Sequence, residues 1–101
     1  MINQKSKIFV AGHKGLVGSA ILRILKEKGY SNILTINKKN LDLTDKNKVY
    51  KYLKKNKPDF IFLAAAKVGG IFSNQNYKAE FIYNNLSIQL NVIDSAHKCG
   101  V

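Results

Sequence analysis

The chain has 101 residues, 46% of them hydrophobic, and a formal net charge of +11. This composition excludes a disordered chain, and the length allows one small domain or part of a larger one. No apolar run is long enough to span a membrane, and residues 1–7 lack the apolar core of a signal peptide. Because Cys99 is the single cysteine, it has no partner for an internal disulfide. We therefore expect a cytoplasmic protein without membrane association.

The positive charge comes almost entirely from lysine, and Arg23 is the only arginine. Proteins that read nucleic acids favour arginine, whose guanidinium forms paired hydrogen bonds to bases and phosphates. Lysine shares A/T-rich codons with asparagine and isoleucine, which are also abundant here. We interpret the charge as composition bias on a solvated surface and expect no nucleic-acid partner.

Apolar periodicity predicts strands that alternate with helices along the chain. Runs of β-branched and other apolar residues are typical of buried strands, and they cover residues 7–11, 32–36 and 59–66. Residues 40–43 are typical of a short third strand or an extended segment. Helical spacing covers residues 16–28, 46–56 and 81–98. Thr44 or Asp45 is placed to cap the second of these helices.

This alternation predicts an α/β fold with a parallel sheet. We expect the N-terminal half of a Rossmann NAD(P)-binding domain, with strand order 3-2-1-4 and helices on both faces. Residues 1–101 would then form a single partial domain. The last helix has a polar stripe at Asn84, Ser87, Asn91, Asp94 and Lys98, and an apolar face at Ile82, Leu86, Ile93 and Ala96.

Three glycines stand three residues apart between the first strand and the first helix, at Gly12, Gly15 and Gly18. The first permits a tight turn, the second lets the backbone approach a pyrophosphate, and the third lets helix and strand pack closely. Free N–H groups at the helix N-terminus would then face the phosphates. A glycine-rich turn that only tightens the junction is the alternative, but the context of strand and helix favours dinucleotide binding.

The end of the second strand indicates which dinucleotide binds. An NAD site usually has an acidic residue there for the ribose 2′-hydroxyl, whereas this chain has Asn37, Lys38 and Lys39. Lys38, Lys39 and Lys14 of the glycine loop are suited to a 2′-phosphate, although lysine is common throughout the chain. The pattern therefore predicts NADP(H) as the cofactor.

Two further segments are placed to contact this cofactor. Asp42 is suited to accept a hydrogen bond from the adenine amino group, while Leu43 packs on the ring. The small residues Ala64, Ala65 and Ala66 would let the cofactor lie against the carboxyl edge of the sheet, or would provide a surface for helix packing.

Four segments resemble one enzyme family: GHKGLVGSA at 12–20, LAAAKVGGI at 63–71, NQNY at 74–77 and FIYNN at 81–85. The resemblance is to the GDP-L-fucose synthase family, in the extended short-chain dehydrogenase/reductase group, and it covers about residues 7–101. AAAKVGGI is more specific than the glycine motif, which the whole group shares. The alternatives are another NAD(P)-dependent nucleotide-sugar epimerase or dehydratase, and a non-catalytic NADP(H)-binding module.

The resemblance implies an epimerase/reductase that converts GDP-4-keto-6-deoxy-D-mannose to GDP-L-fucose with NADPH. It implies a GDP-sugar substrate near residues 68–71, the adenine beside Leu41, and a homodimer at full length. Asn85 matches an asparagine that the group uses near its cofactor. The candidate cofactor-binding residues are Gly12, His13, Lys14, Gly15, Leu16, Val17, Gly18, Lys38, Leu41, Asp42, Leu43, Ala64, Ala65, Ala66 and Asn85.

The family's catalytic tyrosine and lysine would follow Val101, so we expect no catalytic residue here and an inactive chain on its own. Tyr50 and Lys54 have the Tyr-x-x-x-Lys spacing, but they precede the last predicted strand and belong to a lysine-rich outer helix. No metal site is expected, because His97 and Cys99 lack a third ligand. An unpaired apolar edge at residues 59–63 predicts a marginally stable or self-associating chain.

Overall fold

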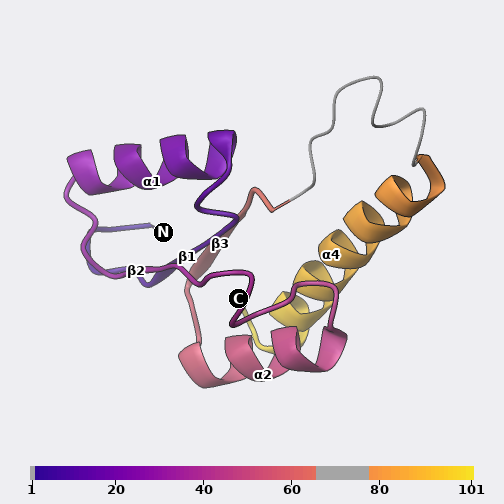
Figure 1. Cartoon of the computed structure of the whole chain (residues 1–101). Coiled ribbons are helices and arrows are strands. Elements are labelled where there is room, and N and C mark those ends of the chain that lie inside the picture. The colour runs from indigo at the N-terminus through magenta and orange to yellow at the C-terminus, as the bar shows by residue number, and fades with distance from the viewer. Residues whose placement is uncertain (1, 66–77) are drawn as a thin grey trace.

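The computed structural model describes residues 2–65 and 78–101. Within them, strands and helices alternate from the N-terminus to the C-terminus (Figure 1). The strands are β1 (Ile8–Ala11), β2 (Ile33–Leu34) and β3 (Phe60–Leu63). The helices are α1 (Leu16–Glu27), α2 (Lys46–Asn56) and α4 (Lys78–Lys98). The predicted alternation is therefore confirmed, and α2 has the predicted bounds.

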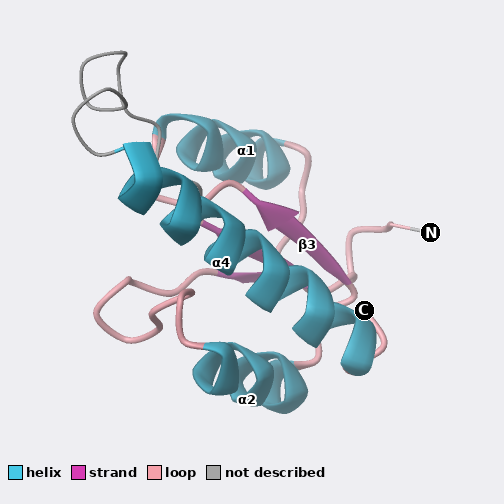
Figure 2. Ribbon diagram, turned by 90° about the vertical axis from the view of Figure 1, so that its right-hand side faces the viewer, coloured by secondary structure: helices cyan, strands magenta, loops and turns pink. Residues whose placement is uncertain are grey.

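The strands form a parallel sheet in the order β2-β1-β3. β1 lies in the centre, with Ile8 opposite both Ile33 and Phe60. Helix α1 covers one face of the sheet, and α2 and α4 pack side by side on the other (Figures 1 and 2). The parallel sheet with helices on both faces is thus as predicted.

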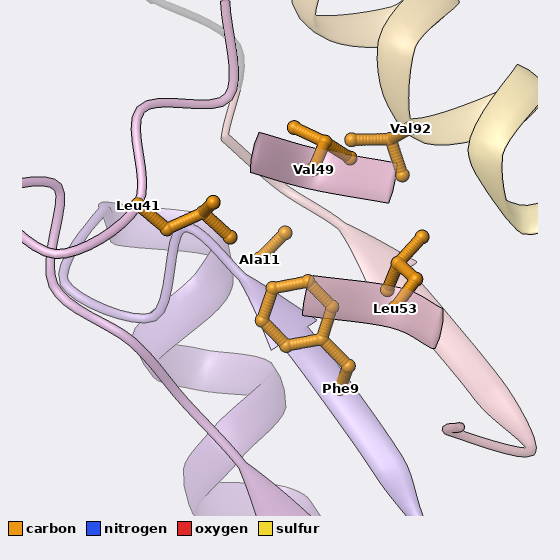
Figure 3. Packing of buried hydrophobic residues seen from close by; sticks show 6 residues of the cluster. All are labelled: Phe9, Ala11, Leu41, Val49, Leu53 and Val92. Atoms are coloured by element: carbon orange, nitrogen blue, oxygen red, sulfur yellow. The ribbon is translucent and has the colours of Figure 1, made fainter. Parts of the chain in front are cut away.

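The central strand supplies side chains to two cores, because successive residues of a strand point to opposite faces. Ile8 and Val10 pack with Leu25 of α1. Phe9 and Ala11 point the other way, toward α2 and α4. The second core is shown in Figure 3 and comprises Phe9, Ala11, Leu41, Val49, Leu53 and Val92. Burial on both faces explains why β1 is apolar at every position.

The predicted strand order 3-2-1-4 is wrong, because residues 40–43 do not form a strand. The carbonyl of Asn37 accepts hydrogen bonds from the N–H groups of Asn40 and Leu41, which closes a turn after β2. The side chain of Asp42 then accepts from the Thr44 N–H. These local bonds compete with a sheet ladder for the same backbone groups, so the segment takes an irregular course along the sheet edge.

The side of helix α4 that faces the core is not the predicted apolar face, which includes Leu86 and Ile93. Its buried residues include Ile88, Val92 and Ser95, whereas Leu86 and Ile93 are exposed. The stripe at Asn84, Ser87, Asn91 and Asp94 is half-buried. Among the side chains of this helix that the structure describes, the exposed large apolar ones are Tyr83, Leu86, Leu90 and Ile93. Among the described residues, no helix combines the length and apolar character that crossing a membrane requires.

Candidate functional site: a pocket at the carboxyl edge of the sheet

The turn between β1 and α1 depends on the absence of a side chain at Gly12. Its φ of +89° is in the left-handed region that favours glycine. A Cβ atom there would lie 2.7 Å from the carbonyl carbon and oxygen of Ala64 and from Cα of Ala65. Gly12 therefore lets the turn after β1 lie directly against the backbone that follows β3.

The other two glycines of the motif differ from each other in their surroundings. Gly18 is buried in α1, and a Cβ atom there would overlap the carbonyl oxygen of Gly12. Gly15 is exposed, and a Cβ atom would make only an ordinary contact at 3.5 Å with the same oxygen. The fold thus requires glycine at positions 12 and 18 but leaves room for a Cβ atom at position 15.

Helix α1 begins without a side-chain cap, because its N-cap residue is Gly15. The first backbone N–H groups of a helix lack acceptors within the helix. Here these donors belong to Leu16, Val17 and Gly18, and no acidic side chain occupies the first turn. The side chains of Leu16 and Val17 are exposed. The turn therefore presents backbone N–H donors and a partial positive charge that no acidic side chain of the first turn neutralises. Such a turn suits an anion such as a phosphate.

A pocket of about 430 Å³ lies beside this turn, across the carboxyl ends of the strands. The polar or glycine positions that line it include Gly12, Gly15, Lys38, Asp42, Thr44 and Asn84. Its apolar lining is Phe9, Ala11, Ile36, Leu41, Leu43, Ala64, Ala65 and Ile88. The pocket is therefore an apolar slot with a glycine turn and a few polar groups along it, which is typical of a site for a small organic ligand.

Asp42 and Thr44 form a hydrogen-bonded unit in the pocket wall. The Thr44 hydroxyl donates to Oδ1 of Asp42 at 2.6 Å, and the Thr44 N–H donates to the same oxygen at 2.9 Å. These two bonds lower the pKa of Asp42, and the positive charges of Lys38 and Lys48 add to the effect. Asp42 is thus a carboxylate whose Oδ2 has no donor among the described residues.

The structure brings together most of the candidate cofactor-binding residues. Those that line the pocket are Gly12, Gly15, Lys38, Leu41, Asp42, Leu43, Ala64 and Ala65. His13, Lys14, Leu16, Val17 and Gly18 belong to the adjoining turn and α1, and Asn85 is the neighbour of Asn84 on α4. Ala66 and residues 68–71 lie outside the described residues. Binding of a cofactor by these residues stays a prediction.

Several lining residues are not in the predicted set. Asn84 rather than Asn85 lines the pocket, together with Ile88 of the same helix. Thr44 also lines the pocket. The sequence predicts Thr44 or Asp45 as the cap of α2, and Asp45 is the cap, because it accepts a hydrogen bond from the Lys48 N–H at 3.2 Å. The spacing Asp42-x-Thr44 is the available signal, because a side chain of Asp often accepts from the N–H two residues on.

The Tyr50 and Lys54 pair belongs to α2 and is absent from the described lining of the pocket. Lys54 Nζ lies 5.8 Å from the centre of the Tyr50 ring. This distance is typical of a cation–π contact on a helix surface.

A parallel sheet whose first strand leads through a glycine turn into a helix, with a pocket across the strand ends, defines a Rossmann-type fold of the dinucleotide-binding class. The sequence pattern of the NAD dependent epimerase/dehydratase family matches residues 8–101. The chain therefore belongs to that family.

Two relatives that match nearly the whole chain are named GDP-L-fucose synthases. GDP-L-fucose synthase 1 of Arabidopsis thaliana is 52% identical over 101 residues, which are 100% of this chain and 31% of the relative. GDP-L-fucose synthase of Escherichia coli K12 is 43% identical over 97 residues, 96% of this chain and 30% of the relative. Among solved structures, the GDP-mannoheptose C4 reductase MlghC of Campylobacter jejuni with NADP bound has a TM-score of 0.95 at 38% identity, covering 100% of this chain and 32% of that one.

The two kinds of glycine predict opposite results for substitution by alanine. Gly18→Ala should lower the free energy of unfolding by several kcal/mol, because its Cβ atom meets backbone that cannot move aside. Gly15→Ala should leave it within about 1 kcal/mol of the wild type. Urea denaturation of both variants measures the difference. Equal destabilisation by the two substitutions would contradict the described packing of the turn.

The Thr44 hydroxyl should control the ionisation of Asp42. Thr44→Val removes the O–H donor and should raise the pKa of Asp42 toward its ordinary value, whereas Thr44→Ser should keep it low. Carboxyl carbon NMR during an acid titration measures this. A lowered pKa stabilises the folded state above the unfolded-state pKa, and this contribution is lost as pH falls through the folded-state pKa. The stability difference between wild type and Thr44→Val should therefore shrink in acid. An unchanged Asp42 titration in Thr44→Val would show that the hydroxyl does not act on the carboxylate.

Proposed function

We propose that this chain is the NADP(H)-binding part of an epimerase/reductase that makes GDP-L-fucose from GDP-4-keto-6-deoxy-D-mannose. The observation that carries the proposal is the continuous pocket that joins the glycine turn at Gly12 and Gly15 to Lys38 and Asp42. Relatives named GDP-L-fucose synthase are 52% and 43% identical to the chain and support the choice of substrate. A reductase of similar fold has NADP bound, which supports the cofactor.

In this proposal the chain's residues hold and orient the two halves of the cofactor. The N–H groups of Leu16, Val17 and Gly18 face the pyrophosphate, and the lack of a side chain at the exposed Gly15 lets it approach the backbone. Ala64 and Ala65 leave room for the nicotinamide half. The bound cofactor supplies the hydride that reduces a ketone.

The adenosine half of the cofactor occupies the other part of the pocket. Lys38 supplies the positive charge that a 2′-phosphate requires. Oδ2 of Asp42 accepts from the adenine amino group, since Oδ1 is already bonded to Thr44. Leu41 and Leu43 line the pocket on the same segment and provide apolar contacts for the adenine.

The chain spans about 30% of the length of the curated relatives that it matches. We therefore propose that residues 1–101 form one part of a NAD(P)-binding domain. The acid and base groups for epimerisation, the tyrosine and lysine for reduction, and the domain that holds the GDP-sugar would belong to the rest of the protein. On this proposal, the 101 residues bind cofactor but do not turn over substrate.

We also propose that the whole protein is a homodimer. Four apolar residues of α4 are exposed in the described part of the helix, Tyr83, Leu86, Leu90 and Ile93, and they repeat at intervals of three and four residues along one side of it. This spacing is typical of a seam between paired helices. The intervals from Tyr83 to Ile93 are three, four and three residues, which is the same order from either end of the helix. In an antiparallel pair with a second copy, Leu86 of each chain would therefore lie against Leu90 of the other.

Charge on this seam should prevent the pairing. Leu86→Glu combined with Leu90→Glu should halve the mass that light scattering measures, because two carboxylates would have to be buried in the paired helices. Ile24→Glu, at a half-exposed apolar position on α1, is the matched control and should leave the mass unchanged. A mass unaffected by the α4 substitutions would contradict pairing through this helix.

The cofactor choice can be tested with two adjacent lysines. Lys38 lines the pocket, whereas Lys39 is exposed and absent from its described lining. Lys38→Ala should weaken NADPH binding by about tenfold or more and leave NADH binding within twofold, because only NADPH has the 2′-phosphate. Lys39→Ala should change neither. The chain has no tryptophan, so NADPH fluorescence can be followed directly. Equal affinity of the wild type for NADPH and NADH would refute the lysine argument.

A further inference from the structure

The segment from Leu41 to Asp45, whose first four residues line the pocket and form one wall of it, has no place in the sheet. The β1–β2 ladder ends at Leu34, so backbone bonds to a neighbouring strand do not fix its position. Its internal bonds, from the Thr44 N–H and hydroxyl to Asp42, set the shape of the turn only. Something outside the segment has to hold it against the rest of the molecule.

Among the described residues, contacts of three kinds connect the segment to other elements. Leu41, 5% exposed, is buried in the core that α2 and α4 cover, and the half-buried Leu43 packs against the same core. Asp45 caps α2 at the other end of the segment. Between these two anchors, the side-chain Nδ2 of Asn91 donates to the carbonyl oxygen of Leu43 at 2.9 Å across 48 residues of sequence. Asn91 is half-buried on α4.

The position of Asn91 on α4 gives this contact a further consequence. Asn84 and Ile88 line the same pocket and precede Asn91 by seven and three residues. Residues at these intervals lie on one side of a helix, over about 10 Å of its length. One side of α4 therefore contributes to the pocket lining at Asn84 and Ile88 and holds the Leu41–Asp45 wall at Asn91.

We infer that Asn91 is a positioning residue that fixes the adenine end of the pocket by holding the Leu43 carbonyl. The inference rests on the proposed function, because it takes the wall that carries Asp42 and Leu43 as the adenine site. Asn91 does not line the pocket, so it acts through the wall rather than on the ligand. Without its amide, the Leu43 carbonyl loses a donor, and Asp42 is no longer held at a fixed distance from α4.

This arrangement predicts an effect on one half of the cofactor only. The glycine turn and Ala64 hold the other half through β1 and β3, with which Asn91 has no hydrogen bond among the described residues. Loss of the Asn91 bond should therefore weaken adenosine recognition and leave recognition of the nicotinamide half unchanged. A general loss of stability would instead weaken both halves together.

The test uses Asn91→Ala and the near-isosteric Asn91→Asp, which places a carboxylate oxygen where the donor stood. Gln89→Ala, at an exposed position on the same helix, is the control. The probes are NADPH, adenosine 2′,5′-bisphosphate for the adenine half and nicotinamide mononucleotide for the other half, each titrated calorimetrically. Hydrogen exchange of the amides at residues 43–45 reports the hold on the wall without any ligand.

We expect both Asn91 variants to bind adenosine 2′,5′-bisphosphate about tenfold more weakly, as loss of one partly buried hydrogen bond implies. Nicotinamide mononucleotide should bind within twofold of the wild type, and amides 43–45 should exchange faster. Unchanged adenosine bisphosphate binding, or equal weakening of both halves, would overturn the role of Asn91. Failure of the wild type to bind NADPH would instead overturn the proposed function, and this inference with it.

Discussion

The arrangement of this chain depends on one approach of backbone to backbone, where Gly12 meets the residues after β3 and Gly18 meets Gly12. A Cβ atom on Gly12 would lie 2.7 Å from the Ala64 carbonyl, so the turn after β1 can touch the end of β3 only without a side chain. The same contact fixes where α1 begins and which N–H groups it presents. It also brings Gly12 and Ala64 together as pocket lining. A steric requirement of folding and, in the proposed function, a requirement of cofactor binding are thus met by the same residues.

Helix α4 contributes side chains to the core, to the pocket and its wall, and to the exposed surface. Ile88 and Val92 are buried, Asn84 and Asn91 face the pocket and its wall, and Leu90 remains exposed. Polar side chains on this helix therefore form part of the inner surface, and apolar ones part of the outer surface. In the proposed homodimer, a contact between subunits would lie on the opposite side of the same helix from the cofactor.

Much of this fold follows from local pattern. The apolar run of β1, the glycine spacing and the bounds of α2 could be predicted because each is set by residues close together in sequence. The course of residues 40–43 could not be predicted in this way. Hydrogen bonds of Asp42 and Thr44 with nearby backbone take the place of strand pairing there. The side of α4 that faces the core was also predicted wrongly. Periodicity placed Leu86 and Ile93 on one face, and only tertiary packing shows that Ile88 and Val92 are the buried residues.

The central place of β1 has a consequence for biosynthesis. Ile8 pairs with Phe60, so the innermost strand leaves the ribosome 52 residues before its neighbour β3. At typical rates of translation, this interval is on the order of seconds. During it, four consecutive apolar residues have no complete sheet to join, and parallel pairing across such a distance in sequence is slow to form. The nascent chain therefore exposes the apolar central strand of its sheet before the strand's partner exists, and binding of a chaperone to residues 8–11 would protect it until β3 emerges.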